Sequence, residues 1–543
     1  NAGLPIARLN KNGRNSMPKF ALKKPRDWFL ICTWIALLAV FAGLVVYMSL
    51  HIKNLLDADL SSELILAKQL KQSGGILSSN WYYSTEIRFL NTQLVYSLFF
   101  HLFDDWQTVR IIGNITLYLV LLASYYFLCK RLRITRYFPL TAAIMLLPIS
   151  APYFYVLLYG TYYIPRVSSM FIILGLLIQP SRKLGQKVSA SVVLSSLAAG
   201  ALSLALGLEG ARMLLVLFVP LAIVVGAEFI ARIFRSFKQA HSKQSQEIDS
   251  FSFPLYLIQS FFVCVCALAG YLINQKILIH AYPFEQYGAI IPSLTLGSIR
   301  RTFFNQIFLI GYGKLTFYLS MAIWAVAGIL FVWYLLRKGE KSSSTLRFVW
   351  LCFASWACYT AFCCVIDFGQ AVWHTVPVAV LWIPATAAIL REGRPLPAIR
   401  RALCIGLSLC FLIVGITGYF EFENWSNREG SRTNNAYQQI TAVLEEKGYK
   451  NGYATFWNAN ILTELSDGAI DVWCVEEFDK NTTQSPDIYP WLQVRTHQNT
   501  LPSGRTFLVW NAEEYAAYSK EHFPYLDGII YQDDAFIVFD VKQ

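Results

Sequence analysis

Long apolar runs, many of about twenty residues and separated by short polar segments, follow one another from residue 28 to residue 420. A run of this length is what an α-helix needs to cross the hydrocarbon core of a bilayer. The pattern therefore predicts an all-α polytopic membrane bundle of about eleven transmembrane helices. The predicted spans are residues 28–50, 109–129, 137–150, 168–179, 188–208, 213–230, 251–273, 315–336, 347–365, 371–390 and 402–420.

The pattern changes at residue 421, where short segments with the period of strands alternate with amphipathic helical segments. Residues 436–446 predict a helix, and residues 452–457, 470–475, 506–510, 528–531 and 535–541 predict strands. Residues 421–543 are therefore expected to form a small α/β domain. Since they contain neither a glycine-rich phosphate loop nor a nucleophile elbow, we expect no active site in this domain.

The charge distribution gives the bundle an orientation. The formal net charge is +12, and most Lys and Arg side chains lie in short loops at alternate ends of the predicted spans. This positive-inside pattern places the basic tail 1–27 in the cytoplasm and both the loop 51–106 and the C-terminal domain outside. Because the basic residues belong to membrane loops, the net charge does not indicate a nucleic-acid partner.

The cysteines and the N-terminus exclude other classes of protein. Eleven cysteines are present, all but Cys474 in or beside apolar runs, and none has the spacing of a zinc site. We interpret them as small packing residues. Met17 precedes a basic segment and the first apolar run, so we expect the native chain to start there, with residues 1–16 as an extension. The first run lacks a small-residue cleavage site and is expected to remain as an anchor.

Candidate chemistry is concentrated directly after the first predicted span, in the sequence DADLSSE. It contains Asp57, Asp59 and Glu63, and in a helix Asp59 and Glu63 would share one face, with Asp57 at the N-terminal end. Carboxylates at the mouth of a membrane bundle suit a general base or a cation site. The same residues equally fit an acidic, solvated loop that opens a helix.

Residues 28–136 resemble the membrane glycosyltransferases of the GT-C fold, in particular the bacterial protein-mannosyltransferase and aminoarabinose-transferase type. In those enzymes an Asp follows the first span and a Glu commonly stands six residues later, as Asp57 and Glu63 do here. An interfacial helix and a second span with an arginine near its outer start come next. The corresponding run here is NTQLVYSLFFHLFDDWQTVRIIGNITLYLVLLASYYFLCKRL, with Arg110 in that place.

The chain also departs from this pattern. Asn91-Thr92-Gln93 replaces a His-Pro-Pro-type opening of the interfacial helix, and Asp59 does not adjoin Asp57 as the second acid usually does. Trp373-His374 stands where an Arg-Tyr pair is more usual. The segment GYATFWNANILTELSDG is similar to one in uncharacterised Gram-positive membrane proteins. The resemblance is therefore silent on the substrate.

The resemblance implies transfer of a sugar, with inversion, from a polyprenyl-phosphate donor to an acceptor hydroxyl or amine. This chemistry needs a general base for the acceptor and cations for the departing phosphate. Asp57 is the predicted base, since desolvation at a membrane rim raises a carboxyl pKa. Asp59 and Glu63 are expected to orient the acceptor or Asp57; a divalent-cation site is the alternative, and no other cofactor is predicted.

Arginines on the predicted outer side are candidate phosphate ligands, because the positive-inside rule makes them unexpected there. They are Arg300 and Arg301, which are adjacent, together with Arg212 and Arg166. The alternative is that Arg212 pairs with Glu209 and that the others reach lipid headgroups. For Arg110 we expect a structural pair with Asp104 or Asp105.

Aromatic residues and one histidine complete the candidate site. Trp81, Tyr82, Tyr83 and His374 are predicted to contact the sugar or the acceptor. An aromatic belt at the membrane interface explains the three aromatic residues equally well, and His374 also fits a packing role.

The sequence thus predicts a multi-pass glycosyltransferase of the bacterial plasma membrane whose site faces outside. Its predicted partners are a polyprenyl-phosphate-linked sugar, the lipid bilayer and an acceptor that is a cell-surface glycan, lipid or protein. Two rival hypotheses are a transporter or flippase of lipid-linked sugars, and a non-catalytic membrane protein with an outer interaction domain. Against transport, no internal repeat or pair of broken helices is evident in the sequence.

Overall fold

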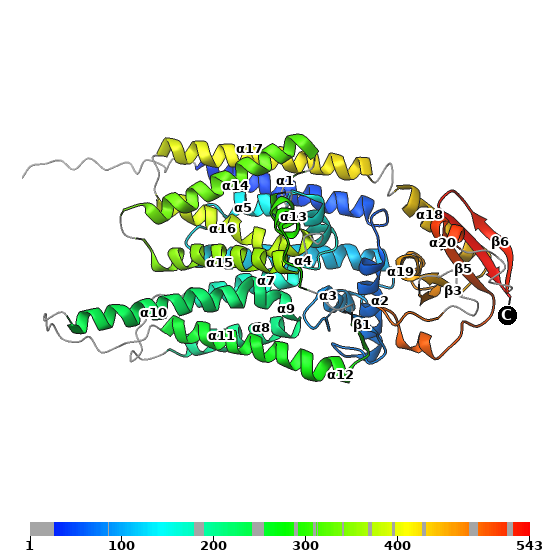
Figure 1. Cartoon of the computed structure of the whole chain (residues 1–543). Helices are drawn as coiled ribbons and strands as arrows, with labels where there is room; N and C mark the ends of the chain where they lie inside the picture. Colours follow the sequence, from blue (N-terminus) through cyan, green and yellow to red (C-terminus); the bar gives the residue numbers. More distant parts are fainter. Residues whose placement is uncertain are drawn as a thin grey trace, which may run out of the picture.

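The computed structural model describes residues 27–84, 86–178, 189–241, 255–286, 292–307, 311, 313–338, 341–366, 372–393, 397–425, 431–476, 487–517 and 525–542. A long bundle of helices carries a small domain at one end, which we call the domain end of the bundle (Figure 1). Met17 and all of the predicted N-terminal tail except Asp27 lie outside the described residues.

The bundle is polytopic, as predicted. Within the described ranges, nine helices are long and apolar enough to cross a membrane, or ten if one bent pair counts as a single span. They are Trp28–His51, Trp106–Arg131, Ala190–Leu208, Ala211–Phe237, Leu255–Ala281, Leu315–Leu336, Ser343–Val365, Trp373–Gly393 and Ala398–Glu421; the bent pair is Ala151–Tyr159 with Ile164–Leu177.

The structure has fewer spans than the sequence predicts because of residues 137–179. The predicted span 137–150 contains only α5 (Phe138–Met145), a helix of eight residues, which is too short to cross a bilayer. The predicted span 168–179 is instead the second arm of the bent pair, whose two helices meet at an angle of 81°.

Side-chain caps set where the first long helices begin. The Asp27 carboxylate accepts a hydrogen bond from Leu30 N in the first turn of α1 (Trp28–His51). In α4 (Trp106–Arg131) the Asp105 carboxylate accepts one from Thr108 N at 2.6 Å, and Lys130 and Arg131 occupy the last turn. Acidic caps and basic last turns both complement the helix dipole.

The remaining helices of the bundle are α7 (Ile164–Leu177), α8 (Ala190–Leu208), α10 (Val219–His241), α11 (Leu255–Ile273), α14 (Gly313–Leu336), α15 (Ser343–Val365), α16 (Val376–Gly393) and α17 (Pro397–Trp425). The main core of the bundle lies between them and α1, α4 and α5. α17 continues to Trp425, past the domain boundary predicted at residue 420.

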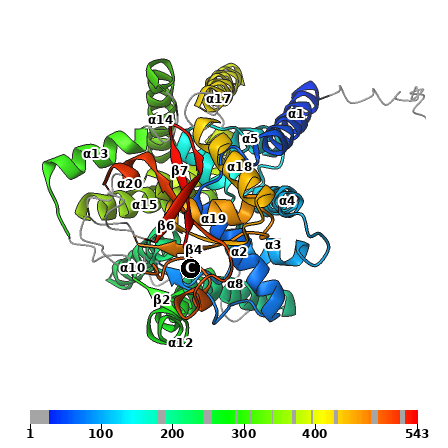
Figure 2. The ribbon, with the colours of Figure 1, turned by 90° about the vertical axis from the view of Figure 1, so that its right-hand side faces the viewer.

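Short elements cover the domain end of the bundle. α2 (Ala58–Ser73) and α3 (Thr92–Phe99) pack on one another, and α3 lies where the sequence predicts an interfacial helix. β1 (Tyr83–Ser84) pairs in parallel with β2 (Phe284–Glu285). α13 (Leu296–Ile307) runs across the bundle and projects from its side (Figure 2).

The C-terminal domain is the predicted α/β unit. Its five-stranded sheet has the order β4-β3-β5-β7-β6, with β3 parallel to β4 and β5, and β7 antiparallel to β5 and β6. The strands are β3 (Asn451–Thr455), β4 (Asp471–Val475), β5 (Thr506–Asn511), β6 (Leu526–Gln532) and β7 (Phe536–Val541). The helices are α18 (Ser431–Glu446), α19 (Phe456–Leu465) and α20 (Ala512–Ala517).

The domain and the bundle share one hydrophobic core. Leu64 and Leu66 of α2, and Trp106 at the start of α4, belong to the same buried cluster as Leu462 and Ile470 of the domain. In both views α19 lies beside α2 (Figures 1 and 2). Because burying apolar surface is the main force that holds domains together, we expect the two parts to form one unit.

Candidate active site

Asp57 lies between the end of the first span and the start of α2. It is the N-cap residue of α2, and its carboxylate accepts a hydrogen bond from Leu60 N at 2.8 Å. A capping Asp is common because its oxygen satisfies a free amide of the first helical turn. The cap therefore fixes this carboxylate at the domain end, and both Asp57 and Asp59 are only partly exposed.

The surroundings of Asp57 shift its proton equilibrium. Burial, together with the negative charge of Asp59, raises the pKa of Asp57 to about 7, although the Tyr155 hydroxyl, the Leu60 amide and the charge of Arg110 act in the opposite direction. Burial likewise raises the pKa of Asp59, against the charge of Arg88. A carboxyl that titrates near neutral pH is suited to act as a general base.

A break in the bent span brings tyrosines to these carboxylates. Phe154–Tyr159 forms a π-helical segment, and Tyr155 and Tyr162 both lie within electrostatic range of Asp57 and Asp59. At the turn between the two arms, Thr161 has a φ of 55°, and its hydroxyl donates to Asn114 Oδ1 at 3.2 Å. Strained backbone and π-helical segments are both concentrated at functional sites.

Glu63 lies deeper than the two aspartates and is already bound. Its carboxylate accepts a hydrogen bond from the Thr92 hydroxyl at 2.8 Å and forms an ion pair with Arg88. The charge of Arg88 is in turn within range of Asp59, Arg166 and Glu209. Glu63 thus joins α2 to α3 and holds Arg88 near Asp59.

Arg166 lies in a buried network with two carboxylates. Its guanidinium donates to Glu209 at 2.9 Å and to Glu86 at 3.0 Å. Arg212 is 3.8 Å from Glu86, so the Arg212–Glu209 pair considered from the sequence is not formed. Gly210 makes this arrangement possible, because its φ is +95° and any side chain there would meet Glu86.

Arg212 has more room for a ligand than Arg166. Its side chain is 22% exposed, whereas that of Arg166 is 4% exposed. Both guanidinium groups lie 5.6 Å from the centre of the Tyr163 ring, and the Tyr163 hydroxyl is 2.7 Å from His374 Nδ1. His374 is buried, and it contacts the same tyrosine that the two guanidinium groups approach.

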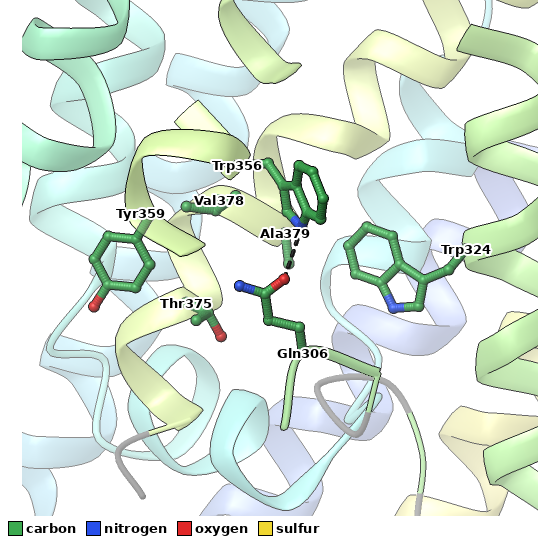
Figure 3. A pocket seen from close by; sticks show the side chains of 7 residues that line it. All are labelled: Gln306, Trp324, Trp356, Tyr359, Thr375, Val378 and Ala379. Atoms are coloured by element: carbon green, nitrogen blue, oxygen red, sulfur yellow. Dashed lines mark hydrogen bonds between the residues drawn. The ribbon is translucent and has the colours of Figure 1, made fainter. Parts of the chain in front are cut away.

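A pocket lies between α13, α14, α15 and the start of α16 (Figure 3). Gln306 sits at its centre and accepts a hydrogen bond from Trp356 Nε1 at 2.7 Å, with Trp324 on one side and Tyr359 on the other. An apolar cavity between α5, α14, α16 and α17 shares Trp324 and Ala379 with this pocket. The two hollows are therefore neighbours, with Trp324 and Ala379 between them.

The other two predicted arginines lie on α13, away from its buried face. Ser298, Thr302 and Gln306 form the buried face of α13, whereas Arg300 and Arg301 are exposed outside that face. The Arg300 guanidinium lies 5.6 Å from the centre of the Phe304 ring on the same helix.

The predicted sugar-binding aromatic residues lie mainly in the joint between bundle and domain. Trp81 is buried and its backbone bridges to Val494, and the buried Tyr83 hydroxyl accepts a hydrogen bond from Ser78 N at 2.9 Å. The Tyr82 hydroxyl bonds to Gln498, and only this ring of the three is partly exposed. In this structure Trp81 and Tyr83 pack the joint, so they offer no ring face to a sugar.

The prediction that Arg110 pairs with Asp104 or Asp105 is wrong. Its guanidinium binds Glu464 of the C-terminal domain, with Nε 2.7 Å from Oε1 and Nη2 2.6 Å from Oε2. Asp105 is engaged as the cap of α4, and Asp104 lies 3.9 Å from Lys71. Sequence reasoning did not find Glu464, nor Glu86 and Arg88, because these residues stand in segments without a periodic pattern or come from another domain.

A metal site does not stand out in this region. In the part of the chain that the structure describes, no group of three or more His, Cys, Asp or Glu side chains is arranged to hold a metal ion. Because Glu63 is bound to Arg88 and Thr92, it is not free to join Asp57 and Asp59. The divalent cation considered from the sequence stays a prediction.

Comparison with known proteins identifies the fold. No protein-family model and no curated protein sequence matches the chain. Among solved structures, the chain is similar to the crystal structure of ArnT from Cupriavidus metallidurans bound to undecaprenyl phosphate, with a TM-score of 0.54. The similarity covers 94% of this chain and 98% of ArnT, at 11% sequence identity. The chain has an ArnT-like GT-C fold.

This similarity reaches further than the sequence resemblance did. The sequence resembled GT-C enzymes over residues 28–136, whereas the ArnT-like fold includes the rest of the bundle and the C-terminal domain. Nearly complete coverage at low identity means that the helices keep their arrangement while most side chains differ. The fold prediction is therefore confirmed.

Proposed function

We propose that the protein is a polyprenyl-phosphate-dependent membrane glycosyltransferase in which Asp57 is the general base. The observation that carries the proposal is a partly buried carboxyl with a pKa of about 7, within electrostatic range of Arg110, at one end of an ArnT-like bundle. The similar structure contains undecaprenyl phosphate, the kind of lipid that such a donor carries.

The reaction transfers a proton to Asp57, forms one bond at the anomeric carbon and breaks another. The acceptor hydroxyl or amine gives its proton to the Asp57 carboxylate, and its electron pair forms a bond to the anomeric carbon of the sugar. The bond between that carbon and the phosphate oxygen breaks, with inversion, and the bonding electrons leave with the polyprenyl phosphate. Asp57 then releases its proton to water.

The donor phosphate has a complementary position near Arg212. Arg212 is the more exposed of the two arginines in the Glu86–Glu209 network, and guanidinium groups bind phosphate well through paired hydrogen bonds. Arg88 contributes a second positive charge beside Asp59. The apolar cavity next to the Gln306 pocket suits part of an isoprenoid chain. The acceptor is a cell-surface glycan, lipid or protein of a bacterium.

The test is sugar transfer by the purified full-length protein in detergent. Synthetic undecaprenyl-phosphate sugars are supplied with a mixture of envelope lipids and glycans, and release of undecaprenyl phosphate is measured. We expect Asp57→Asn to lower the rate about 10²- to 10⁴-fold. Asp104→Asn is the matched control. This substitution removes the same charge, but from a side chain that is 95% exposed.

Two results would overturn the proposal. The first is an Asp57→Asn protein that transfers sugar as fast as the wild type. The second is movement of lipid-linked sugar across proteoliposomes by a wild-type protein that transfers none, which would support a flippase instead.

A further inference from the structure

A buried ion pair joins the C-terminal domain to the bundle. Glu464 lies near the end of α19, and Arg110 lies in the second turn of α4. Their side chains are 6% and 1% exposed, and the two hydrogen bonds between them have lengths of 2.7 and 2.6 Å. Burying two charges costs much solvation energy, so a pair of this kind is weak evidence for stability alone.

The pair is connected to the first turn of α2. Arg110 Nη2 donates a second hydrogen bond to the Leu60 carbonyl oxygen at 3.0 Å. The amide of the same residue donates a hydrogen bond to the Asp57 carboxylate. On the same face of α19, Asn460 Nδ2 is 3.4 Å from the Ala58 carbonyl oxygen. The domain thus contacts the turn that Asp57 caps at two places, once directly and once through Arg110.

A third contact holds α4 in position. The Asp467 carboxylate of the domain accepts a hydrogen bond from Trp106 N at 2.9 Å, at the first residue of α4. Gly468 lies so close to the Trp106 ring that a side chain there would collide with it. The domain therefore fixes the helix that carries Arg110 as well as the guanidinium group itself.

We propose that Glu464 is a positioning residue of the active site, which holds Arg110 so that Arg110 in turn sets the place and the charge environment of Asp57. The inference rests on the proposed function. It means that the C-terminal domain is a part of the active site and supplies one of its buried charges, in addition to any role in binding an acceptor.

The charges around Asp57 determine what the loss of Glu464 does. Asp57 faces Asp59 of its own helix, three tyrosines of the broken span (Tyr155, Tyr159 and Tyr162), and Arg110 of α4. With Glu464→Gln, the positive charge of Arg110 loses its partner and attracts the ionised Asp57 more strongly. The acid limb of the pH–rate profile then moves to lower pH, by about one unit.

The test compares Glu464→Gln with Glu446→Gln in the full-length protein. Glu446 is exposed at the end of α18, so its variant removes the same charge from the same domain without touching the pair. We expect Glu464→Gln to lower kcat about 10- to 100-fold, to leave the KM for the donor within about twofold, and to shift the acid limb. Glu446→Gln keeps the wild-type values.

Hydrogen exchange separates this inference from the proposed function. Amides of residues 58–64 are expected to exchange faster in Glu464→Gln than in the wild type and Glu446→Gln. If the wild type transfers no sugar, the proposed function fails, and faster exchange still supports the link to α2. A folded Glu464→Gln protein with unchanged kcat and pH profile in an active preparation, or with unchanged exchange in an inactive one, overturns the inference.

A second variant covers the case in which Glu464→Gln does not fold. Asn460→Ala removes the direct contact to Ala58, together with the hydrogen bonds of Asn460 to Leu492 and Cys474, and leaves both buried charges paired. A several-fold loss of kcat with an unchanged donor KM is expected for this variant if α19 positions α2. Unchanged kcat in Asn460→Ala overturns the part of the inference in which α19 positions α2 by direct contact.

Discussion

Carboxylates of the candidate site fall into two groups according to what holds them. Glu63, Glu86 and Glu209 each lie beside an arginine, so their negative charges are neutralised within the protein. The Asp57 carboxylate instead accepts a hydrogen bond from the Leu60 amide, and burial is the main cause of its raised pKa. The pKa of Asp57 is about 7, so its ionisation changes in the physiological range, which is the property that a general base needs.

This difference predicts a pH dependence of the rate. Because the base must be ionised, a pKa of about 7 for Asp57 makes kcat/KM rise tenfold per pH unit below neutrality and level off above it. The negative charge of Asp59 contributes to the raised pKa, so Asp59→Asn should move the acid limb to lower pH. The pH–rate profiles of both proteins check this; a wild-type limb near pH 4 would contradict it.

The two classes of arginine predict different effects on donor binding. Arg212 lies in the network with Tyr163 and Glu86, whereas Arg300 is exposed on α13. We expect Arg212→Gln to weaken binding of undecaprenyl phosphate about tenfold or more, since hydrogen bonds to charged groups contribute about 1.5–3 kcal/mol. Arg300→Gln is the matched control, with less than about a twofold effect.

Titration of intrinsic tryptophan fluorescence with undecaprenyl phosphate measures both affinities. A larger effect of Arg300→Gln than of Arg212→Gln would place the phosphate at α13, as the adjacent arginines of the sequence first suggested.

At the scale of elements, breaks in helices shape the site. Three π-helical segments, Phe154–Tyr159, Leu214–Phe218 and Asn274–Leu278, interrupt spans near their domain ends. The first brings Tyr155 to Asp57, the second follows Arg212, and in the third Asn274 Nδ2 donates to the Leu208 carbonyl oxygen at 2.6 Å, next to Glu209. Regular helices would continue past the site, whereas these breaks turn side chains toward it.

The helix pair α8 and α11 predicts a sharp difference between two glycines. An added Cβ at Gly270 would collide with the Leu204 carbonyl oxygen, and one at Gly207 with that of Ala267, so these backbones touch directly. We expect Gly270→Ala to lower the free energy of unfolding by about 1–3 kcal/mol, because the helices must separate. At Gly226 of α10 nothing lies within 4 Å of an added Cβ.

Gly226→Ala is therefore the control, and we expect it to be neutral or to stabilise slightly through helix propensity. Thermal unfolding of the two variants in the same detergent checks the difference. Equal melting temperatures would show that α8 and α11 leave room for an added Cβ at Gly270.

At the scale of the whole molecule, the orientation of the bundle in the membrane is predicted from the charge distribution alone. If the positive-inside pattern is correct, the C-terminal domain and Asp57 lie on the extracytoplasmic side. A C-terminal fusion to alkaline phosphatase is then expected to be active in intact cells, and a C-terminal fusion to green fluorescent protein to be dark. The opposite result would place the site in the cytoplasm and exclude an outward-facing transferase.

Whole-molecule architecture also explains which parts of the site the sequence predicts. Asp57, Asp59 and Glu63 could be found because they lie within seven residues of each other beside a span, where a local pattern is visible. Arg166, Arg212 and His374 were found individually, and the structure joins them through Tyr163. Arg300 and Arg301 are adjacent in the sequence, but the buried face of α13 is formed by other residues.

The membrane bundle, the α/β domain and the location of the acidic cluster are predictable from the sequence, because they depend on local periodicity and composition. The pairing of Glu464 with Arg110 and of Glu209 with Arg166, and the helix break beside Asp57, become visible only in the folded chain. Such contacts join residues up to 354 positions apart in the chain. They depend on how the bundle packs, which no local pattern records.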